Sequence, residues 1–444
     1  MLRHTGRTRR HRWALLVAAL LVIGSAACGS SGSGTSGGQS TKGITGTTAP
    51  TYRTLSVGEG QPYTTIQAAV DAAKPGDLIL IHPGVYKEEV IVETENIVLR
   101  GVDRNKVIID GEFTRENGIK VFANGIAVEN LTSRNHKGNG IFFTGDYDSN
   151  FVLTGYRVSY VTAYNNGNYG IYAFNATKGQ FDHSYGSGHP DSAFYIGQCK
   201  PCDAVVTDVI AENNALGYSG TNSTGVSVVN SVWRNNRIGI VPNSQDTEKL
   251  APVEGTLVAG NLVVDNNNGN TPLKDDAWNV AFGSGIVATG VNNVIIRNNR
   301  VENNKRVGII VVIWPFGTMF IPRGNQVLNN ISRGAETYGD LVLGLLDSSE
   351  GPLDNCFSGN EFVTSRPIDL EKIAPCGGQG SSGFETLDIN ALLPGPAGVD
   401  YKSVPAPPEQ PTMPDATTAP PVPADSSWSP VSIDPASIVT PAPA

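Results

Sequence analysis

The chain has 444 residues and a formal net charge of −9 at pH 7, from 41 acidic and 32 basic side chains. Loss of the first 27 residues, which carry five arginines and no acidic residue, would lower this charge to −14. An acidic surface of this kind argues against nucleic acid as a partner and against general attraction of polyanions.

The first 27 residues have the composition of a secretory signal peptide, with a basic start, an apolar run from Trp13 to Ile23 and small residues before Cys28. The apolar run is too short to span a bilayer permanently. Cys28 resembles the acylated cysteine of the lipobox in bacterial lipoproteins, which implies an extracytoplasmic protein anchored to the cell membrane. Cleavage after Ala27 and secretion is the alternative. Residues 28–51 read as a Gly/Ser/Thr-rich tether.

A six-residue pattern repeats through the middle of the chain, with Asn at its first and last positions in most copies. The eight copies start at Asn130, Tyr160, His183, Asp208, Asn230, Asn261, Asn299 and Asn325. The short Val- and Ile-rich runs between Asn/Gly turns indicate strands. Such strands bury a face only when equivalent turns stack about 4.8 Å apart. Stacking would place asparagines above one another as a hydrogen-bonded ladder.

The segment TIQAAVDAAKPGDLILIHPGVYKE, an amphipathic helix followed by a strand, is expected to cover the open first turn. This segment, with IVLRG and VIIDG after it, resembles the opening of right-handed parallel β-helix proteins of the pectin-lyase superfamily. The resemblance implies an all-β, single-stranded right-handed parallel β-helix over residues 52–376. The superfamily contains polysaccharide lyases, hydrolases, esterases, epimerases, phage tailspikes and noncatalytic surface proteins, so fold alone does not assign function. The Pro-rich residues 377–444 are expected to be a disordered tail.

Three consecutive copies depart from Asn at the first position of the repeat. They carry Tyr160, His183 and Asp208, which stacking would place in one column. In the same region Gly188 interrupts the Asn at the sixth position, and His189 and Asp191 flank Pro190 in that corner. Breaks in a consistent pattern are where a functional site is most expected. The alternative is that the Tyr160 column points inward and its members hydrogen-bond to one another.

An aromatic column is predicted beside this cluster. Phe142, Tyr172 and Tyr195 follow core positions with a period of two, so they should face outward, where sugar rings can stack. Lys200 and Arg157 flank the cluster and are candidates to offset the carboxylate of a substrate.

The cluster supplies the residue types that a polyuronate lyase or C5-epimerase needs. His189 or His183 is a candidate base, Tyr160 or Tyr185 a candidate donor or acceptor of the second proton. Asp191 or Asp208 is a candidate to orient a histidine or to share a calcium ion. Alginate epimerases and related lyases resemble this stretch in carrying Tyr-Gly followed by Asp-Pro-His. Here Tyr185-Gly186 precedes His189-Pro190-Asp191, with the last three residues in reverse order.

Two further features concern metals and disulfides. Asp146, Asp148 and Asn150 alternate like the oxygen ligands of a calcium loop, although a solvated loop explains them too. The remaining four cysteines are even in number, which in an exported chain predicts the local disulfides Cys199–Cys202 and Cys356–Cys376. The spacing in CKPC also fits a redox or metal motif.

The sequence thus predicts a β-helix that binds a polysaccharide or cell-envelope glycan, as a lyase or epimerase. A noncatalytic glycan-binding protein, an accessory protein that delivers metal to another enzyme, and a structural stalk are the alternatives. The insertions at residues 242–255 and 266–283 are expected to project from the stack and to frame a binding face.

Overall fold

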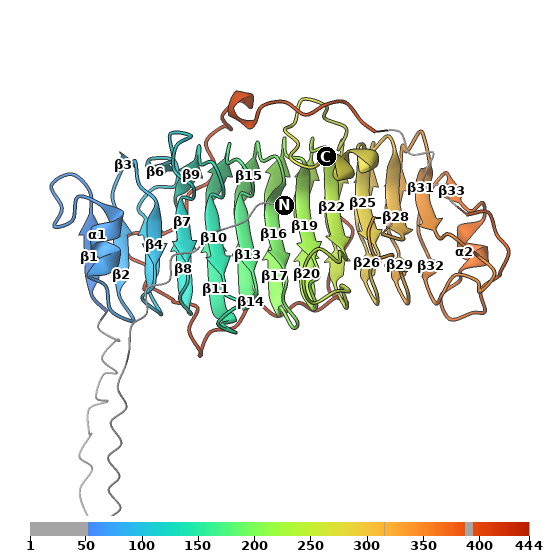
Figure 1. The fold of residues 1–444 in the computed structure, drawn as a ribbon, viewed down its shortest axis with the longest axis horizontal. Coiled ribbons are helices and arrows are strands. Elements are labelled where there is room, and N and C mark those ends of the chain that lie inside the picture. The colour runs from blue at the N-terminus through green and yellow to red at the C-terminus, as the bar shows by residue number, and fades with distance from the viewer. Residues whose placement is uncertain (1–51, 315, 387–393, 444) are drawn as a thin grey trace, which may run out of the picture. The chain divides into compact units, whose positions relative to one another are not determined.

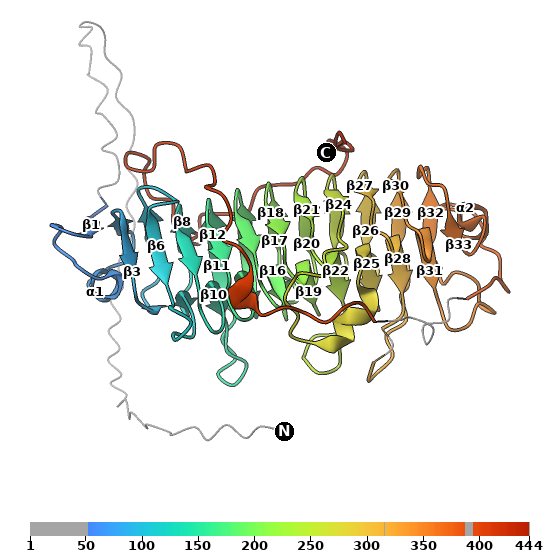
Figure 2. The same ribbon diagram turned by 90° about the horizontal axis from the view of Figure 1, so that it is seen from above.

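The computed structural model describes residues 52–314, 316–386 and 394–443. The signal peptide, Cys28 and the tether at 28–51 lie outside the described residues. Within the described part of the chain, three parallel sheets wind around one core (Figures 1 and 2). Each coil contributes one strand to each sheet in turn, and each strand pairs in parallel with its equivalent one coil later. The predicted single-stranded right-handed parallel β-helix is therefore confirmed.

Sheet A has 12 strands among the described residues. They are β1 (Thr54–Val57), β2 (Leu78–Ile81), β5 (Val98–Gly101), β8 (Ile126–Glu129), β11 (Leu153–Ser159), β14 (Ala176–Asp182), β17 (Ala204–Thr207), β20 (Val226–Val229), β23 (Leu257–Ala259), β26 (Ile295–Arg297), β29 (Gln326–Leu328) and β32 (Cys356–Ser358).

Sheet B has ten strands in the same part of the chain. They are β3 (Gly84–Tyr86), β6 (Val107–Asp110), β9 (Thr132–Arg134), β12 (Thr162–Tyr164), β15 (Tyr185–Ser187), β18 (Ile210–Glu212), β21 (Val232–Arg234), β24 (Leu262–Val264), β27 (Arg300–Glu302) and β30 (Ile331–Arg333).

Sheet C has 11 strands within the described ranges. They are β4 (Val90–Val92), β7 (Ile119–Val121), β10 (Ile141–Thr144), β13 (Ile171–Phe174), β16 (Ser192–Gly197), β19 (Leu216–Thr221), β22 (Ile238–Asn243), β25 (Ser284–Thr289), β28 (Val307–Val312), β31 (Gly339–Gly344) and β33 (Ser365–Arg366).

The core forms because alternate side chains of every strand point inward and meet their equivalents one coil away. In sheet A, for example, Val128, Val158 and Phe181 lie in one register column, and all three are fully buried. Stacked apolar columns of this kind from all three sheets make one continuous hydrophobic cluster.

The recurrent asparagines have two different causes. Asn130 and Asn230 have φ of 56° and 49°, in the left-handed region that Asn tolerates better than most residues, so they turn the chain. The ladder is made by the residue that follows this turn. Asn261 donates through its side-chain amide to Asn299 Oδ1 at 3.0 Å, and Asn299 donates in the same way to Asn330 at 2.9 Å. In the copies that start at Asn261 and Asn299, the first asparagine therefore occupies the ladder position, one residue after the turn position that Asn130 and Asn230 occupy.

The copy at Asn325 belongs to a different corner, because this residue precedes a strand of sheet A rather than of sheet B. Its side-chain amide donates to Asn355 Oδ1 at 2.7 Å. The single ladder that the sequence predicts is therefore a set of separate ladders at different corners.

Helices close the two ends of the stack. In α1 (Ile66–Asp71) the residues Ile66, Ala69 and Val70 are buried against the first coils, and Thr65 caps the helix by accepting from Ala68 N. This confirms the predicted N-terminal cap. At the other end, α2 (Leu370–Ile373) supplies Glu371, whose carboxylate accepts from the side-chain amide of Asn360 at 2.8 Å and so ends the asparagine ladder.

Both predicted disulfides are present. Cys199 pairs with Cys202 and Cys356 with Cys376, each with Cα atoms 4.8 Å apart. The second bond fastens the last strand of sheet A to the segment that follows α2. Among the described residues, no helix has the length and apolar character needed to cross a bilayer.

Residues 394–443, here called the C-terminal strap, lie extended against the coils (Figure 1). The prediction of a disordered tail is wrong for these residues. Extended Pro-rich backbone leaves its carbonyl groups unpaired, and arginines of the coils donate to them. Arg237 donates to Pro396 O at 2.7 Å, Arg100 to Ala419 O at 2.6 Å, and Arg300 to Pro441 O at 2.8 Å. The short 3-10 helix η3 (Tyr401–Ser403) lies within this strap.

Candidate functional site

The outward face of sheet C carries the predicted aromatic column. Phe142, Tyr172 and Tyr195 are register partners on neighbouring strands β10, β13 and β16. The rings of Phe142 and Tyr172 stack in parallel with centroids 4.5 Å apart, and those of Tyr172 and Tyr195 meet edge to face at 4.9 Å. The column continues to Lys120 on one side, whose Nζ lies 5.4 Å from the centroid of Phe142. The column points away from the core as expected, but only Phe142 and Tyr172 are partly exposed, since Tyr195 is buried at 3% exposure.

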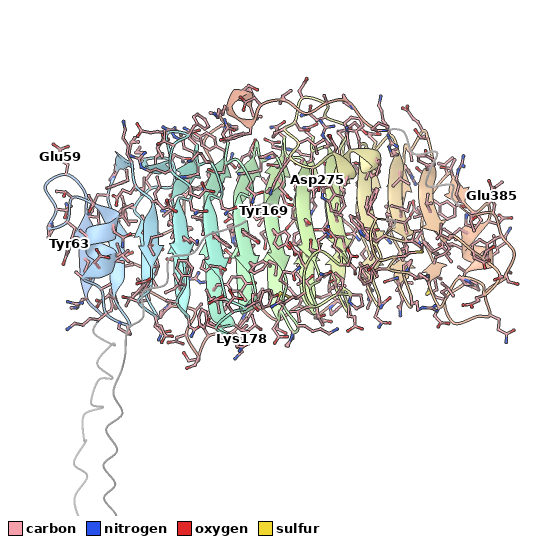
Figure 3. The ribbon with its side chains drawn as sticks, in the orientation of Figure 1. Glu59, Tyr63, Tyr169, Lys178, Asp275 and Glu385 are labelled. Carbon is pink, nitrogen blue, oxygen red and sulfur yellow. A yellow bond between two sulfur atoms is a disulfide. The ribbon has the colours of Figure 1, made fainter. Side chains whose placement is uncertain are left out.

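Tyr169 and Asp191 lie next to this column, at the corners that lead into β13 and β16. Figure 3 labels Tyr169 in the middle of the stack. Its ring centroid is 4.4 Å from that of Tyr172 and 4.9 Å from that of Tyr195. The carboxylate of Asp191 accepts a hydrogen bond from Ser192 Oγ at 2.9 Å, and the nearby Tyr169 hydroxyl favours its ionised form. Asp191 is half-buried. Burial raises its pKa, and the nearby charge of Lys274 opposes that effect.

The first insertion, residues 242–255, brings a second carboxyl group to the same place. Glu248 accepts a hydrogen bond from Gln198 Nε2, and the nearby Tyr195 hydroxyl favours its ionised form. Glu248 is exposed, yet partial desolvation by the groups around its carboxyl group, followed by the charge of Asp191, raises its pKa. The next residue, Lys249, places its Nζ 4.3 Å from the ring centroid of Tyr147.

The second insertion, residues 266–283, contains the 3-10 helix η1 (Asp276–Ala281) and supplies a cation. Lys274 donates from Nζ to Asn168 Oδ1 at 2.7 Å, and its backbone N donates to Pro190 O at 2.8 Å. Its Nζ also lies 5.9 Å from the centroid of Tyr169. Both insertions therefore deliver charged side chains to the aromatic column, as a framing role requires.

We call this group the tyrosine cluster. Its members are Tyr169, Tyr172, Tyr195, Asp191, Glu248 and Lys274. Two carboxyl groups with raised pKa values, a lysine and three phenol groups are donors and acceptors suited to a ligand with hydroxyl and carboxylate groups. Aromatic faces add surfaces on which sugar rings can stack.

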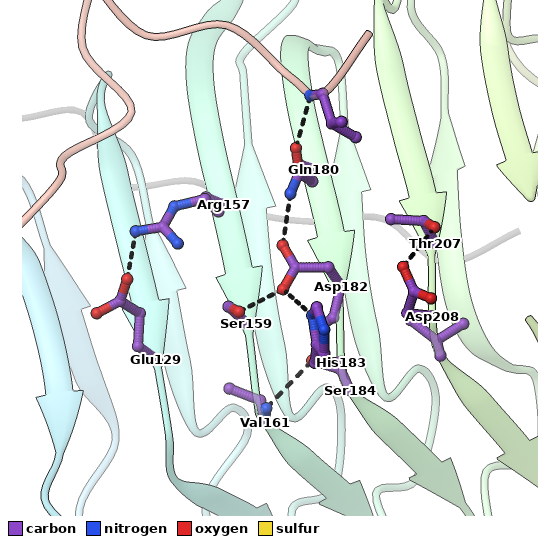
Figure 4. A network of polar contacts seen from close by, with 12 residues as sticks. Glu129, Arg157, Ser159, Val161, Gln180, Asp182, His183, Ser184, Thr207 and Asp208 are labelled. Atoms are coloured by element: carbon purple, nitrogen blue, oxygen red, sulfur yellow. Dashed lines mark hydrogen bonds and ion pairs between the residues drawn. The ribbon is translucent and has the colours of Figure 1, made fainter. Parts of the chain in front are cut away.

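The column of Tyr160, His183 and Asp208 lies elsewhere, at the corner between sheets A and B. Figure 4 shows His183 and Asp208 at this corner. The members of the column are consecutive vertical neighbours, since the rings of Tyr160 and His183 stack with centroids 4.6 Å apart. The side chain of His183 is 48% exposed and Asp208 is exposed, so the inward alternative is wrong. All three residues have φ between 46° and 54°, so they occupy the left-handed turn position of Asn130 rather than a ladder position.

His183 is held by its neighbour Asp182, whose Oδ1 lies 2.9 Å from the His183 Nδ1 (Figure 4). This hydrogen bond raises the pKa of His183. Although burial alone would raise the pKa of Asp182, hydrogen bonds from His183, Ser159 and Gln180 hold it below its usual value. The hollow beside His183 and Asp208 is closed on one side by strap residues 431–438.

The sequence predicts His189 as a candidate base, which requires an accessible side chain, and the structure corrects this prediction. His189 is fully buried, with Nδ1 2.8 Å from Asn214 Oδ1 and Nε2 3.2 Å from Asn166 Nδ2. It therefore replaces an asparagine in the inner ladder, one residue after Gly188. Burial lowers its pKa to about 4, so the imidazole is neutral near pH 7.

Three other predicted site residues also lie away from the tyrosine cluster. Tyr185 is buried on sheet B, where its hydroxyl donates to Glu212 Oε1 at 2.5 Å. Arg157 pairs with Glu129 on sheet A and donates to strap residue Val422 O at 3.0 Å. Lys200 forms an ion pair with Glu254 at 2.8 Å.

The proposed calcium loop is a tight turn. Asp146 accepts from Asp148 N at 3.0 Å through one oxygen and from Ser149 Oγ at 2.7 Å through the other, so both carboxylate oxygens hold the turn together. Asp148 and Asn150 are exposed. Within the described ranges, no three His, Cys, Asp or Glu side chains gather closely enough to hold a metal ion.

Sequence reasoning did not identify Tyr169, Glu248 and Lys274. The signal for the last two was their place in the two insertions. Tyr169 directly precedes the Gly170-Ile171 pair that opens β13, one position before the regular alternation begins.

Comparisons with known proteins agree with the architecture. A family model for the right-handed beta helix region matches residues 139–340. The A-module of the mannuronan C-5 epimerase AlgE6 of Azotobacter vinelandii superposes with a TM-score of 0.51 at 19% identity, covering 66% of this chain and 81% of that one. An alginate lyase from Paenibacillus sp. str. FPU-7 gives a TM-score of 0.40 at 13% identity, with coverages of 71% and 96%. No curated protein sequence matches the chain significantly. The chain therefore has the fold of a right-handed parallel β-helix, which the family model over residues 139–340 and the likeness to the epimerase module both support.

Proposed function

We propose that the tyrosine cluster binds a uronate-containing polysaccharide and acts on it as a polysaccharide lyase or C5-epimerase. The observation that carries this proposal is the position of Asp191, which lies half-buried beside three tyrosines and has a raised pKa. Lys274 lies close enough to affect the pKa of Asp191, and Asp191 lies close enough to affect the pKa of Glu248. A uronate presents a carboxylate, hydroxyl groups and an apolar ring face, and the cluster offers a partner for each.

Proton removal next to a sugar carboxylate requires that the carboxylate be neutralised first. Lys274 supplies a positive charge, and a protonated Asp191 or Glu248 supplies a hydrogen-bond donor. In this proposal one carboxyl group of the pair is protonated and the other is ionised, and the charge of Asp191, which raises the pKa of Glu248, favours this arrangement.

The ionised member of the pair then accepts the C5 proton. In the lyase reaction the C4–O bond breaks as the C4–C5 double bond forms, and a tyrosine hydroxyl gives its proton to the leaving oxygen. In the epimerase reaction the proton returns to C5 from the opposite face of the ring. Tyr172 and Tyr195, whose ring centroids lie 4.9 Å apart, are the candidates for this second proton transfer.

The likeness in fold to the mannuronan epimerase module supports an acidic glycan as the ligand, because that protein is named for such a substrate. The sequence of the first 28 residues supports a location outside the cytoplasm with Cys28 acylated. Noncatalytic glycan binding is the second candidate function, favoured by the stacked rings of Phe142 and Tyr172, which form an aromatic platform for a sugar ring.

The test uses the full chain with polymannuronate, polygalacturonate and an unsulfated glucuronate polymer. Ultraviolet absorbance detects unsaturated uronate, and NMR detects inverted C5 centres. Asp191→Asn is expected to lower turnover by about 10²-fold or more while leaving binding measurable. Tyr172→Ala is expected to weaken binding itself.

His183→Ala is the matched control, because it changes a titratable residue of the same coil on another face. It is expected to leave turnover within about twofold of the unchanged protein. A larger loss for His183→Ala than for Asp191→Asn would move the site to the His183 corner. Binding without any product would favour the noncatalytic function, and neither binding nor product would refute the proposal.

A further inference from the structure

The outward column of sheet C is open on one side of the tyrosine cluster and closed on the other. Towards the first coils the column continues from Tyr172 through Phe142 to Lys120, on the successive strands β13, β10 and β7 (Figure 1). All three side chains are half-buried, so part of each one meets solvent. A ligand held at the cluster can therefore continue over the outward face in this direction.

On the other side, the two insertions cover the column. Its next members after Tyr195 are Ser219 on β19 and Val241 on β22, and both are buried although they point away from the core. Trp278 of the second insertion packs against the hydrophobic cluster that contains Val241. The column is therefore closed directly after Tyr195, and an extended ligand that lies along it has to end at the tyrosine cluster.

Lys120 gives the open part of the column a positive charge. Its Nζ lies 4.8 Å from the ring centroid of Phe122 and 5.4 Å from that of Phe142. Phe122 is 38% exposed, so this cation lies beside an aromatic surface that solvent reaches. Within the described ranges, Lys120 forms no ion pair with a carboxylate. Aromatic faces beside a cation match the apolar face and the carboxylate of a uronate unit.

The distance along the column fits several sugar units of one chain. Lys120 and Tyr195 are three strand steps apart in sheet C, which is about 14 Å at about 4.8 Å per step. This length exceeds that of a single sugar ring. A chain that ends at the tyrosine cluster therefore places its following units over Phe142 and beside Lys120.

We infer that the tyrosine cluster takes the terminal unit of a polyuronate chain, and that Lys120 binds the carboxylate of a following unit. This inference deepens the proposed function and rests on it. The protein then engages a chain at one end, whereas a column open on both sides would admit internal units as well.

The first test counts the protein molecules bound to each polymer chain. Polymannuronate, polygalacturonate and the unsulfated glucuronate polymer, each in three size fractions, are titrated by calorimetry into the full chain and into its Asp191→Asn variant, which does not consume the polymer. For a polymer that binds, the number of protein molecules per polymer chain is expected to stay at one in every size fraction.

The alternative results separate this inference from the proposed function. A number of bound molecules that rises in proportion to polymer length overturns the inference, because the protein then binds internal units, and leaves the proposed function intact. Absence of binding to both proteins with all three polymers refutes the proposed function, and the inference with it.

The second test measures the contribution of Lys120. Lys120→Met keeps an extended side chain and removes the charge, so it should weaken binding of a uronate tetramer about twofold to fivefold and leave binding of the dimer unchanged. Lys74→Met, which removes an exposed lysine between α1 and β2, is the matched control and should change neither affinity. Unchanged tetramer binding in Lys120→Met, or an equal loss in both variants, overturns the role of Lys120.

Discussion

The two corners that flank β15 hold the two histidines of one coil in opposite environments. His183 occupies the left-handed turn position, faces outward and gains a carboxylate partner, so its pKa rises. His189 occupies the ladder position after the next turn, is fully buried, and its pKa falls to about 4. Both break the asparagine pattern, yet neither lies in the tyrosine cluster. A break in the asparagine repeat thus marks a substitution at a turn or ladder position. It does not locate the candidate binding residues, which lie on the outward face of sheet C.

The largest expected effect that separates the two corners is acid destabilisation. His136 and His189 are both buried, with pKa values of about 4, against about 6.5 in the unfolded chain. Between pH 6.5 and 4 the unfolded state binds more protons, so stability falls as pH falls. Each histidine contributes a loss of about 3 kcal/mol over this window. Chemical denaturation at pH 7 and pH 4 measures the change.

His183 contributes a pH dependence of stability with the opposite sign. Its stabilisation is fully present below pH 6.5 and is lost as pH rises through its raised folded pKa. Since the side chain is half-exposed, this contribution is under about 1 kcal/mol. The double variant His136→Asn/His189→Asn should show a much flatter acid profile. An unchanged profile in that variant would contradict the assignment of the loss to the ladder.

Removal of the C-terminal strap tests the difference between His183 and His189 in a second way. Deletion of residues 394–444 takes away the carbonyl acceptors of Arg100, Arg104 and Arg237, and is expected to cost about 5 kcal/mol, because a hydrogen bond to a charged group contributes about 1.5–3 kcal/mol. Thermal unfolding measures the loss. NMR titration should show a changed environment at His183, which faces the strap, and an unchanged one at His189. A shift of similar size at both histidines would contradict this arrangement.

The smallest expected effects are those of single substitutions at the two corners. His189→Ala removes the side-chain partner of Asn166 Nδ2 and that of Asn214 Oδ1, and should cost about 1–3 kcal/mol in free energy of unfolding. His189→Asn should recover most of that loss, since asparagine fills this ladder position in the following coils. His183→Ala should change stability by less than about 0.5–1 kcal/mol. Equal losses at the two positions would break the distinction drawn between them.

The fold was predictable because stacked coils repeat their requirements. Alternating apolar residues, Asn/Gly turns and an amphipathic opening helix each report a local rule that every coil obeys. Phase was harder to predict. Asn130 turns the backbone, whereas Asn261 forms a hydrogen bond to the next coil. Because both positions carry asparagine, the sequence does not show which of the two roles a given asparagine has.

The site was predictable only in its aromatic half. The period of two placed Phe142, Tyr172 and Tyr195 on one outward face. Glu248 and Lys274 come from insertions, whose paths depend on contacts such as Lys274 N to Pro190 O and not on any repeat. The prediction of His189 as a catalytic base was wrong because a glycine-rich, proline-containing corner usually lies at the surface. Here the side chain of His189 points inward and is part of the inner ladder.

The path of the strap also changes how the coils depend on one another. In an open solenoid each repeat touches only its neighbours, so the array can fray from either end. Here one segment contacts Arg237 beside β22, then Arg100 on β5, then Arg300 on β27, and so joins coils that are many steps apart. Loss of a terminal coil would also release contacts in the middle of the array. The stack is therefore expected to unfold cooperatively, as one unit, and its last segment can dock only after the coils that it joins have formed.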